Sequence, residues 1–162
     1  MNRLSKKKRR IFILLFLLYL ALLFYVTCFG QRMENVSEGS PRYNLEPFKE
    51  ILRYWNKRHI LGTRIMFLNI FGNILMFMPL GAFVCAVPKR TNIIVCFFIS
   101  AFTSLLIETL QFCFKLGSFD VDDLILNTAG GLLGYILYAI VRGIVGYIRF
   151  KSRADVAAAK RS

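Results

Sequence analysis

Residues Phe102 to Leu137, FTSLLIETLQFCFKLGSFDVDDLILNTAGGLLGYIL, decide the fold of this chain. Two apolar runs flank a short connection, and the stretch carries four of the chain's nine acidic residues, namely Glu108, Asp120, Asp122 and Asp123. A carboxylate inside a helix of membrane length costs about 2.5 to 3.5 kcal/mol near the bilayer centre, so it is a candidate for a functional site. The stretch therefore predicts two membrane helices joined at a cluster of acidic side chains.

The composition of the whole chain predicts an integral membrane protein. Of its 162 residues, 56% are hydrophobic and 15% are aromatic, which exceeds the usual content of a soluble domain. Each uncharged run is near the ~20 residues that cross the hydrocarbon, and these runs place spans at about residues 11–30, 66–87, 92–113 and 123–142. We expect an all-α fold, a bundle of four transmembrane helices that forms one membrane domain over residues 11–148.

The basic residues are distributed as a membrane protein requires. The 22 Lys and Arg give a formal charge of +13, but they are spread over ends and loops, which argues against a nucleic-acid partner. Residues 1–10, the pair at 89–90 and the tail at 149–162 fall on one side of a four-span protein, and the positive-inside rule makes that side the cytoplasm. We expect a cell-membrane protein with both termini cytoplasmic. The first apolar run is expected to be an uncleaved anchor, because it is longer than a signal core.

The outer loop from Arg32 to Arg64 holds seven basic residues and four glutamates. The basic residues depart from the positive-inside rule. Residues 31–42 predict an irregular linker. In the NLEPFKEILRYW segment, Asn44 is a plausible N-cap, and apolar residues recur on one helical face. These residues are Leu45, Phe48, Ile51, Leu52 and Trp55. We expect an interfacial amphipathic helix on the outer leaflet, with a small cap packed on the bundle as the alternative.

The second span carries two asparagines one turn apart. Asn69 and Asn73 share a helical face and should point into the bundle, because a polar side chain that faces lipid is penalised. Deeper in the span, Pro79 and Gly81 predict a kink or a carbonyl left free for a neighbouring group.

The third and fourth spans carry further polar residues at helical spacing. The stripe on the third span consists of Ser100, Ser104, Glu108 and Gln111. Asp120-x-x-Asp123 resembles a capping box at the start of the fourth span, and Asn127 shares the face of Asp123. Close helix contact is predicted at three small residues, Gly130, Gly131 and Gly134.

By this topology, polar residues from three spans converge in the outer part of the membrane. They are Asn69, Asn73, Glu108, Gln111, Asp120, Asp122, Asp123 and Asn127. A functional interpretation is a polar pocket that binds a lipid head group, a peptide or a cation. A structural one is that Glu108 and Gln111 pair with the asparagines while the aspartates cap the fourth span. We favour the structural role for Asn69, Asn73, Ser100 and Ser104. We favour the functional role for Glu108 and Asp120, since a single hydrogen bond does not require an ionisable group there.

Catalysis has less support than binding. Carboxylates serve as general acids and bases, and the three aspartates could hold Mg²⁺ against a pyrophosphate. However, no pair of nucleophile and base stands out, and His59, the single histidine, lies in a basic exposed segment. The four cysteines lack C-x-x-C spacing, so we expect free thiols, no metal and no cofactor. A bridge between Cys28 and Cys113 is the alternative.

The polar motifs resemble the VanZ-like family, whose name comes from a protein associated with teicoplanin resistance. The matching segments are N-x-x-x-N...P-x-G (Asn69 to Gly81), S-x-x-x-E-x-x-Q (Ser104 to Gln111) and D-x-D-D...N-x-x-G-G-x-x-G (Asp120 to Gly134). The NLEPF stretch also looks like the family's N-L-x-P-F. The resemblance covers about Asn44 to Tyr138.

The resemblance implies a cell-envelope protein of a Gram-positive bacterium that lowers susceptibility to lipoglycopeptides such as teicoplanin. It implies no reaction and no cofactor. Our first hypothesis is non-enzymatic action at the outer leaflet, where the partners are the lipid bilayer and a lipoglycopeptide. The alternative is a membrane enzyme that acts on a lipid-linked precursor through Glu108, Asp120, Asp122 and Asp123. A third hypothesis is a small carrier that dimerises through a face such as Gly130 and Gly134; the sequence leaves the oligomeric state open.

Overall fold

The computed structural model describes residues 6–30, 43–61, 63–86 and 92–159. Four of its helices are long and apolar enough to cross a membrane. They are α1 (Lys6–Gly30), α4 (Thr63–Ala86), α5 (Ile93–Cys113) and α6 (Val121–Ala159). Two short helices, α2 (Lys49–Asn56) and α3 (Arg58–Leu61), and two strands, β1 (Tyr43–Asn44) and β2 (Phe119–Asp120), complete the described part. The all-α prediction with four spans is confirmed.

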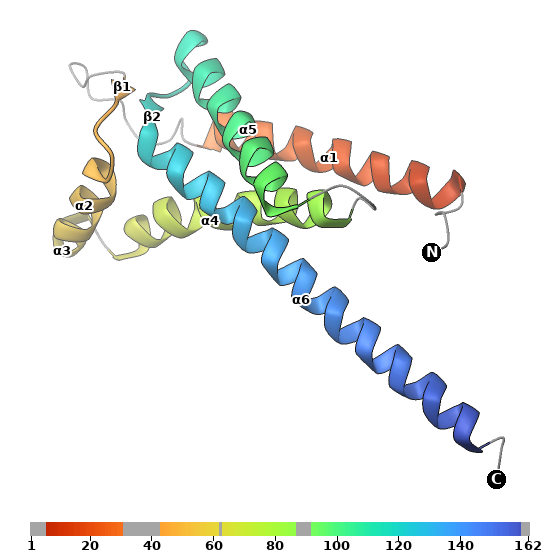
Figure 1. The fold of residues 1–162 in the computed structure, drawn as a ribbon. Helices are drawn as coiled ribbons and strands as arrows, with labels where there is room; N and C mark the ends of the chain where they lie inside the picture. Colours follow the sequence, from red (N-terminus) through yellow and green to blue (C-terminus); the bar gives the residue numbers. More distant parts are fainter. Residues whose placement is uncertain (1–5, 31–42, 62, 87–91, 160–162) are drawn as a thin grey trace.

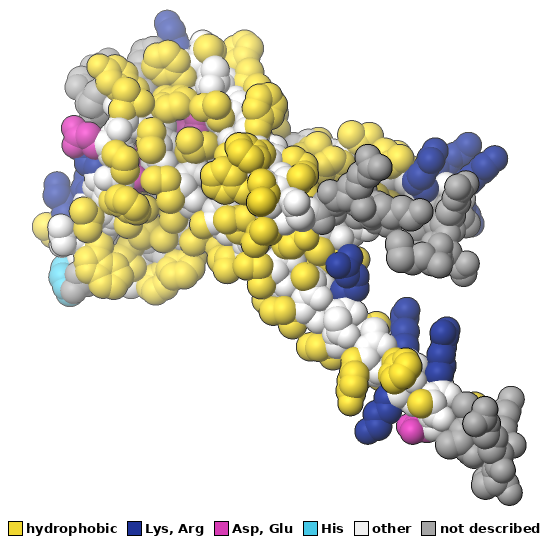
Figure 2. All heavy atoms as spheres, viewed as in Figure 1, with side chains coloured by type: hydrophobic (Ala, Val, Ile, Leu, Met, Phe, Trp, Pro, Cys, Tyr) yellow, Lys and Arg dark blue, Asp and Glu magenta, His cyan; other side chains and the backbone are white. Residues whose placement is uncertain are grey.

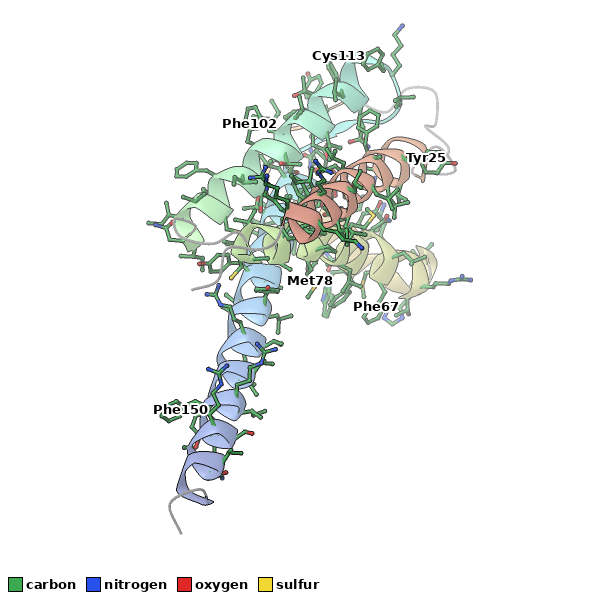
Figure 3. All side chains as sticks on the ribbon, turned by 90° about the vertical axis from the view of Figure 1, so that its right-hand side faces the viewer. Tyr25, Phe67, Met78, Phe102, Cys113 and Phe150 are labelled. Atoms are coloured by element: carbon green, nitrogen blue, oxygen red, sulfur yellow. The ribbon has the colours of Figure 1, made fainter. Side chains whose placement is uncertain are left out.

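The four long helices pack as one group around α6. Helix α6 packs against both α4 and α5, and α1 packs against α4 and α5. Helices α2 and α3 and both strands lie at one end of this group, which we call the α2 end, and the start of α1 and the end of α6 lie away from it (Figure 1). Apolar side chains cover the sides, and Phe102 projects outward from α5 (Figures 2 and 3). The molecule is a multi-pass membrane protein that turns its apolar side chains toward lipid.

Glycines allow α4 and α6 to touch backbone to backbone. A Cβ placed on any of three glycines would lie within 2.2 Å of a carbonyl oxygen of the facing helix. The close pairs are Gly81 with Gly131, Gly130 with Ile74, and Gly134 with Met78. The face of Gly130 and Gly134 is therefore occupied within a single chain. This face is therefore not free for the dimer contact that the carrier hypothesis gave as an example.

Helix α1 is attached to α4 by aromatic side chains. The ring of Phe83 contacts Phe12, Phe16 and Tyr19, with centroid distances of 5.3, 5.3 and 5.7 Å. The Tyr19 hydroxyl donates to the Met76 carbonyl at 2.7 Å. This carbonyl lies in the turn before Pro79, across which α4 continues. A carbonyl near the proline thus receives a donor from a neighbouring helix, as the sequence predicts.

The outer loop of the prediction folds back onto the α5–α6 connection. Strands β1 and β2 pair in parallel, with Tyr43 opposite Phe119 and Asn44 opposite Asp120. The prediction that Asn44 caps the amphipathic helix is wrong, because α2 begins five residues later at Lys49. The Asn44 Oδ1 accepts the Glu46 N–H at 3.2 Å in a local turn. Phe48 then adopts φ 67°, so the chain cannot be helical before Lys49.

Some predictions fall on segments outside the described residues. These are the linker at 31–42, the basic pair at 89–90, the last residues of the tail and the side chain of Cys28. Cys113 is a free, exposed thiol at the end of α5, which contradicts the alternative of a bridge to Cys28. Cys85 and Cys96 are buried free thiols.

Candidate functional site

The N-terminus of α6 is capped by Asp120 of β2, and Glu108 of α5 binds the cap residue in turn. Asp120 Oδ1 accepts the backbone N–H of Asp122 at 2.8 Å. In a capping box, the acid three residues after the cap returns the bond to the N–H of the cap residue. Here that bond comes from α5, because Glu108 Oε2 accepts the Asp120 N–H at 3.0 Å. Asp120 therefore caps α6, but the predicted box with Asp123 is wrong, because Glu108 accepts the Asp120 N–H and Asp123 accepts a hydrogen bond from Asn73 on α4.

Asp122 caps a different helix. Its carboxylate accepts the backbone N–H groups of Phe48, of Glu50 at 2.7 Å and of Ile51 at 3.1 Å. Phe48 occupies the N-cap position of α2 and makes no side-chain cap of its own. Since the first N–H groups of a helix have no partner inside it, Asp122 fixes the start of α2 to the start of α6. Sequence reasoning missed this role, because the partners lie more than 70 residues apart.

A side chain from β1 joins these two caps. Asn44 Nδ2 donates to Asp120 Oδ1 at 3.0 Å. Burial raises the pKa of the Asp120 carboxyl above its usual range, and hydrogen bonds from the Asp122 N–H and from Asn44 offset part of the rise. Burial also raises the pKa of Glu50 on α2, where Arg53 opposes the rise and the charges of Asp120 and Asp122 add to it. The α2 end thus holds two carboxyl groups whose pKa is raised by burial, Asp120 and Glu50.

Deeper in the bundle, the amide side chains pair across helices. Asn73 Nδ2 on α4 donates to Asp123 Oδ1 on α6 at 2.5 Å. Asn127 Nδ2 on α6 donates to Ser104 Oγ on α5 at 2.9 Å. Asn69 lies half-buried one turn from Asn73. These bonds tie α6 to both of its neighbours.

The predicted pairing of Glu108 and Gln111 with the asparagines is therefore wrong. Glu108 instead reaches the backbone of Asp120. Gln111 Nε2 donates to the Thr27 carbonyl of α1 at 2.9 Å. The two residues share a face of α5, but the groups that lie opposite them are the backbone of β2 and the end of α1.

The structure places these predicted polar residues in hydrogen bonds that link elements: Asn73, Glu108, Gln111, Asp120, Asp122, Asp123 and Asn127. Glu108 and Asp122 are only 2% and 1% exposed, so these two carboxylates are closed to solvent, and Asp122 lies against the start of α2. In the described ranges, no three His, Cys, Asp or Glu side chains are placed to hold one metal ion. Around Glu108 and Asp122, the site is therefore a network of hydrogen bonds and not an open pocket.

The comparisons with known proteins agree with this architecture. The model of the VanZ/LLP1 family matches residues 16–142, which contain all of α4 and α5, most of α1 and the first half of α6. The chain belongs to the VanZ/LLP1 family. Protein VanZ of Enterococcus faecium is 34% identical to it over 74 residues. That alignment covers 46% of this chain and 46% of Protein VanZ, less than half of either. No solved structure matches.

Proposed function

We propose that this VanZ-family protein lowers the susceptibility of a Gram-positive bacterium to lipoglycopeptides such as teicoplanin. We place it in the cell membrane with both termini cytoplasmic, so that the α2 end faces outward. Membership of the VanZ/LLP1 family and the similarity to Protein VanZ support this proposal. The action is non-enzymatic and takes place at the outer leaflet, where it limits access of the lipid-tailed drug to its target.

One observation carries the proposal: α2 is fixed to the bundle yet shows its apolar side chains. The Asp122 carboxylate holds the first turn of α2, while no residue of the helix is buried. Leu52 and Trp55 are each 55% exposed on it. An anchored helix with a large exposed apolar face suits contact with lipids or with a lipid-tailed molecule.

The hydrogen bonding of the acids supports the non-enzymatic reading. Glu108, Asp120 and Asp122 each accept backbone N–H groups of this chain. A general acid or base must come within hydrogen-bond reach of its substrate, and the burial of Glu108 and Asp122 prevents this in the present fold.

The enzyme alternative has one favourable observation. Glu108 is buried and accepts the Asp120 N–H at 3.0 Å, so acidic residues from two elements meet there, and such clusters are frequent at functional sites. The substrate would be a lipid-linked envelope precursor. It would reach Glu108 and the aspartates after α2 moved aside.

Susceptibility assays separate the two candidates. We would express the wild type, Glu108→Gln, Asp120→Asn and Asp122→Ala in a Gram-positive host and measure teicoplanin and vancomycin susceptibility, with membrane levels checked by blot. The two amides still accept hydrogen bonds, so we expect both to retain protection. Asp122→Ala removes the cap of α2 and is expected to lose it at equal abundance. Asp155→Asn, an exposed acid near the other end of α6, is the matched control.

The opposite pattern would favour the enzyme. In that case the two amide variants lose protection, and mass spectrometry shows that the wild type alters the precursor profile while the amide variants do not. If the wild type leaves teicoplanin susceptibility at the level of an empty vector, with expression confirmed, the resistance proposal fails.

A further inference from the structure

The outer segment carries a positive charge that membrane topology alone does not explain. Within residues 43–64 the chain has five basic residues and two glutamates. The positive-inside rule disfavours Lys and Arg in a short loop on the outer side. Their presence beside an apolar helix face calls for a negatively charged partner at that surface.

The basic side chains of α2 lie on its exposed surface. Lys49, Arg53 and Lys57, the last at the C-cap, are all exposed. The glutamates of the segment pair only locally, Glu46 with Lys49 at 3.0 Å and Glu50 with Arg53 at 2.6 Å. Surface ion pairs of this kind contribute little to stability, so the side chains of Lys49 and Arg53 remain able to bind a phosphate. Lys57 adds a further positive charge.

The apolar side of the same segment continues the lipid-facing surface of the bundle. Leu52 and Trp55 are exposed on α2. On the first turns of α4, Phe67 and Phe71 stack with a centroid distance of 5.0 Å, and both are exposed. Because α2 and α3 contact α4, exposed apolar and basic side chains occur together at this end of the molecule, as the boundary between acyl chains and head groups requires.

We propose that α2, α3 and the start of α4 bind the head groups of anionic phospholipids in the outer leaflet. Leu52 and Trp55 lie among the acyl chains, and Lys49, Arg53 and Lys57 lie at the phosphate level. Asp122 keeps the helix at this depth because it holds the first turn to the bundle. The inference requires the α2 end to lie at the membrane surface, but it does not depend on drug resistance.

The chain's single tryptophan, Trp55, reports on this surface directly. We would reconstitute the full-length protein in phosphatidylcholine vesicles that contain an equal mole fraction of either brominated phosphatidylglycerol or brominated phosphatidylcholine, and measure quenching of the Trp55 fluorescence. Basic side chains near an anionic surface enrich that lipid locally, so we expect about twofold or greater quenching by the anionic lipid.

Two triple variants make the test specific. Lys49→Gln/Arg53→Gln/Lys57→Gln removes the bases of α2 and should equalise quenching by the two lipids. Arg149→Gln/Lys151→Gln/Arg153→Gln removes the same number of charges from the exposed C-terminal part of α6 and should keep the preference. The helical circular dichroism of each variant must match that of the wild type.

Three results would overturn the proposal. Equal quenching of the wild type by both lipids excludes a preference for anionic head groups. Absence of quenching by either lipid places Trp55 off the bilayer and favours the packed-cap alternative. Loss of the preference in both triple variants assigns it to total charge rather than to α2. None of these measurements contains a drug, so they leave the resistance proposal to the susceptibility assay.

Discussion

At the scale of single residues, Asp122 stabilises the start of a second helix, which its place in the sequence does not indicate. The Asp122 carboxylate accepts three backbone N–H groups from the start of α2. Asp122 itself lies in the first turn of α6. Three acids at a helix N-terminus predict dipole stabilisation of α6. The sequence could not show that one of them serves another helix, because capping patterns are local and this contact is not.

Removing that carboxylate should release α2. Asp122→Ala leaves several N–H groups at the start of α2 without their acceptor, and loss of an N-cap costs about 0.5 to 2 kcal/mol. We expect faster proteolysis between Lys49 and Lys57 and a shifted Trp55 emission maximum. Asp122→Asn keeps one acceptor oxygen and should have a smaller effect. An Ala variant with wild-type cleavage rates would contradict the assigned role.

The pH dependence of stability follows from Asp120 and Glu50. Burial raises the pKa of both carboxyls in the folded chain, so the folded chain holds these protons more tightly than the unfolded chain does. Their contribution to stability is therefore present at pH values below the ordinary carboxyl pKa and is lost as the pH rises through the raised folded value.

We expect the thermal midpoint in detergent to be higher at about pH 5 than at about pH 8 because of this term. The double variant Asp120→Asn/Glu50→Gln removes both titrating groups and should flatten that part of the profile. An unchanged slope in the double variant would assign the pH dependence to other groups.

At the scale of elements, the contact between α4 and α6 is the tightest in the bundle. The glycine pattern of α6 predicts close approach without naming the partner. Gly81 and Met78 on α4 complete it. The sequence also predicts the four spans, because an apolar run of membrane length indicates a helix that lies in lipid. The β1–β2 pairing was not, since a ladder of two residues carries no periodicity.

Substitution of a glycine should destabilise the protein inside this contact and be tolerated outside it. A Cβ on Gly134 would lie 1.8 Å from the Met78 carbonyl oxygen, whereas one on Gly143 or Gly146 meets nothing within 4 Å. We expect Gly134→Ala to lower the thermal midpoint or the yield of folded protein. Gly146→Ala, the matched control on the same helix, should be neutral or stabilising by up to about 1 kcal/mol. Equal effects of the two changes would argue against backbone contact.

At the scale of the whole molecule, the two ends differ in shape and in exposed charge. Exposed Lys and Arg lie at the start of α1 and along the last part of α6, and a separate group lies at the α2 end (Figure 2). Helix α6 has 39 residues, a length of about 58 Å at 1.5 Å per residue, which exceeds the ~30 Å hydrocarbon core. Its basic part, predicted only as a tail, continues the helix and extends beyond the bundle.

Thiol labelling tests the orientation of the molecule. Cys113 is exposed at the α2 end, whereas Phe150 marks the opposite end (Figure 3). In a Cys28→Ser background, we expect a membrane-impermeant maleimide to label Cys113 in intact cells. Ser152→Cys in a Cys113→Ser background, placed on the exposed end of α6, should react only after permeabilisation. The reverse pattern would invert the topology.

The cap on α2 also has a consequence for biosynthesis. Helix α2 leaves the ribosome more than 70 residues before Asp122, which at 5 to 20 residues per second corresponds to roughly 4 to 14 s. Throughout that interval its first turn has no acceptor from α6. The segment that we place outside the cell therefore reaches its final form only after the last membrane helix has begun to insert, and a chain released before that point would present an unfinished surface to proteases.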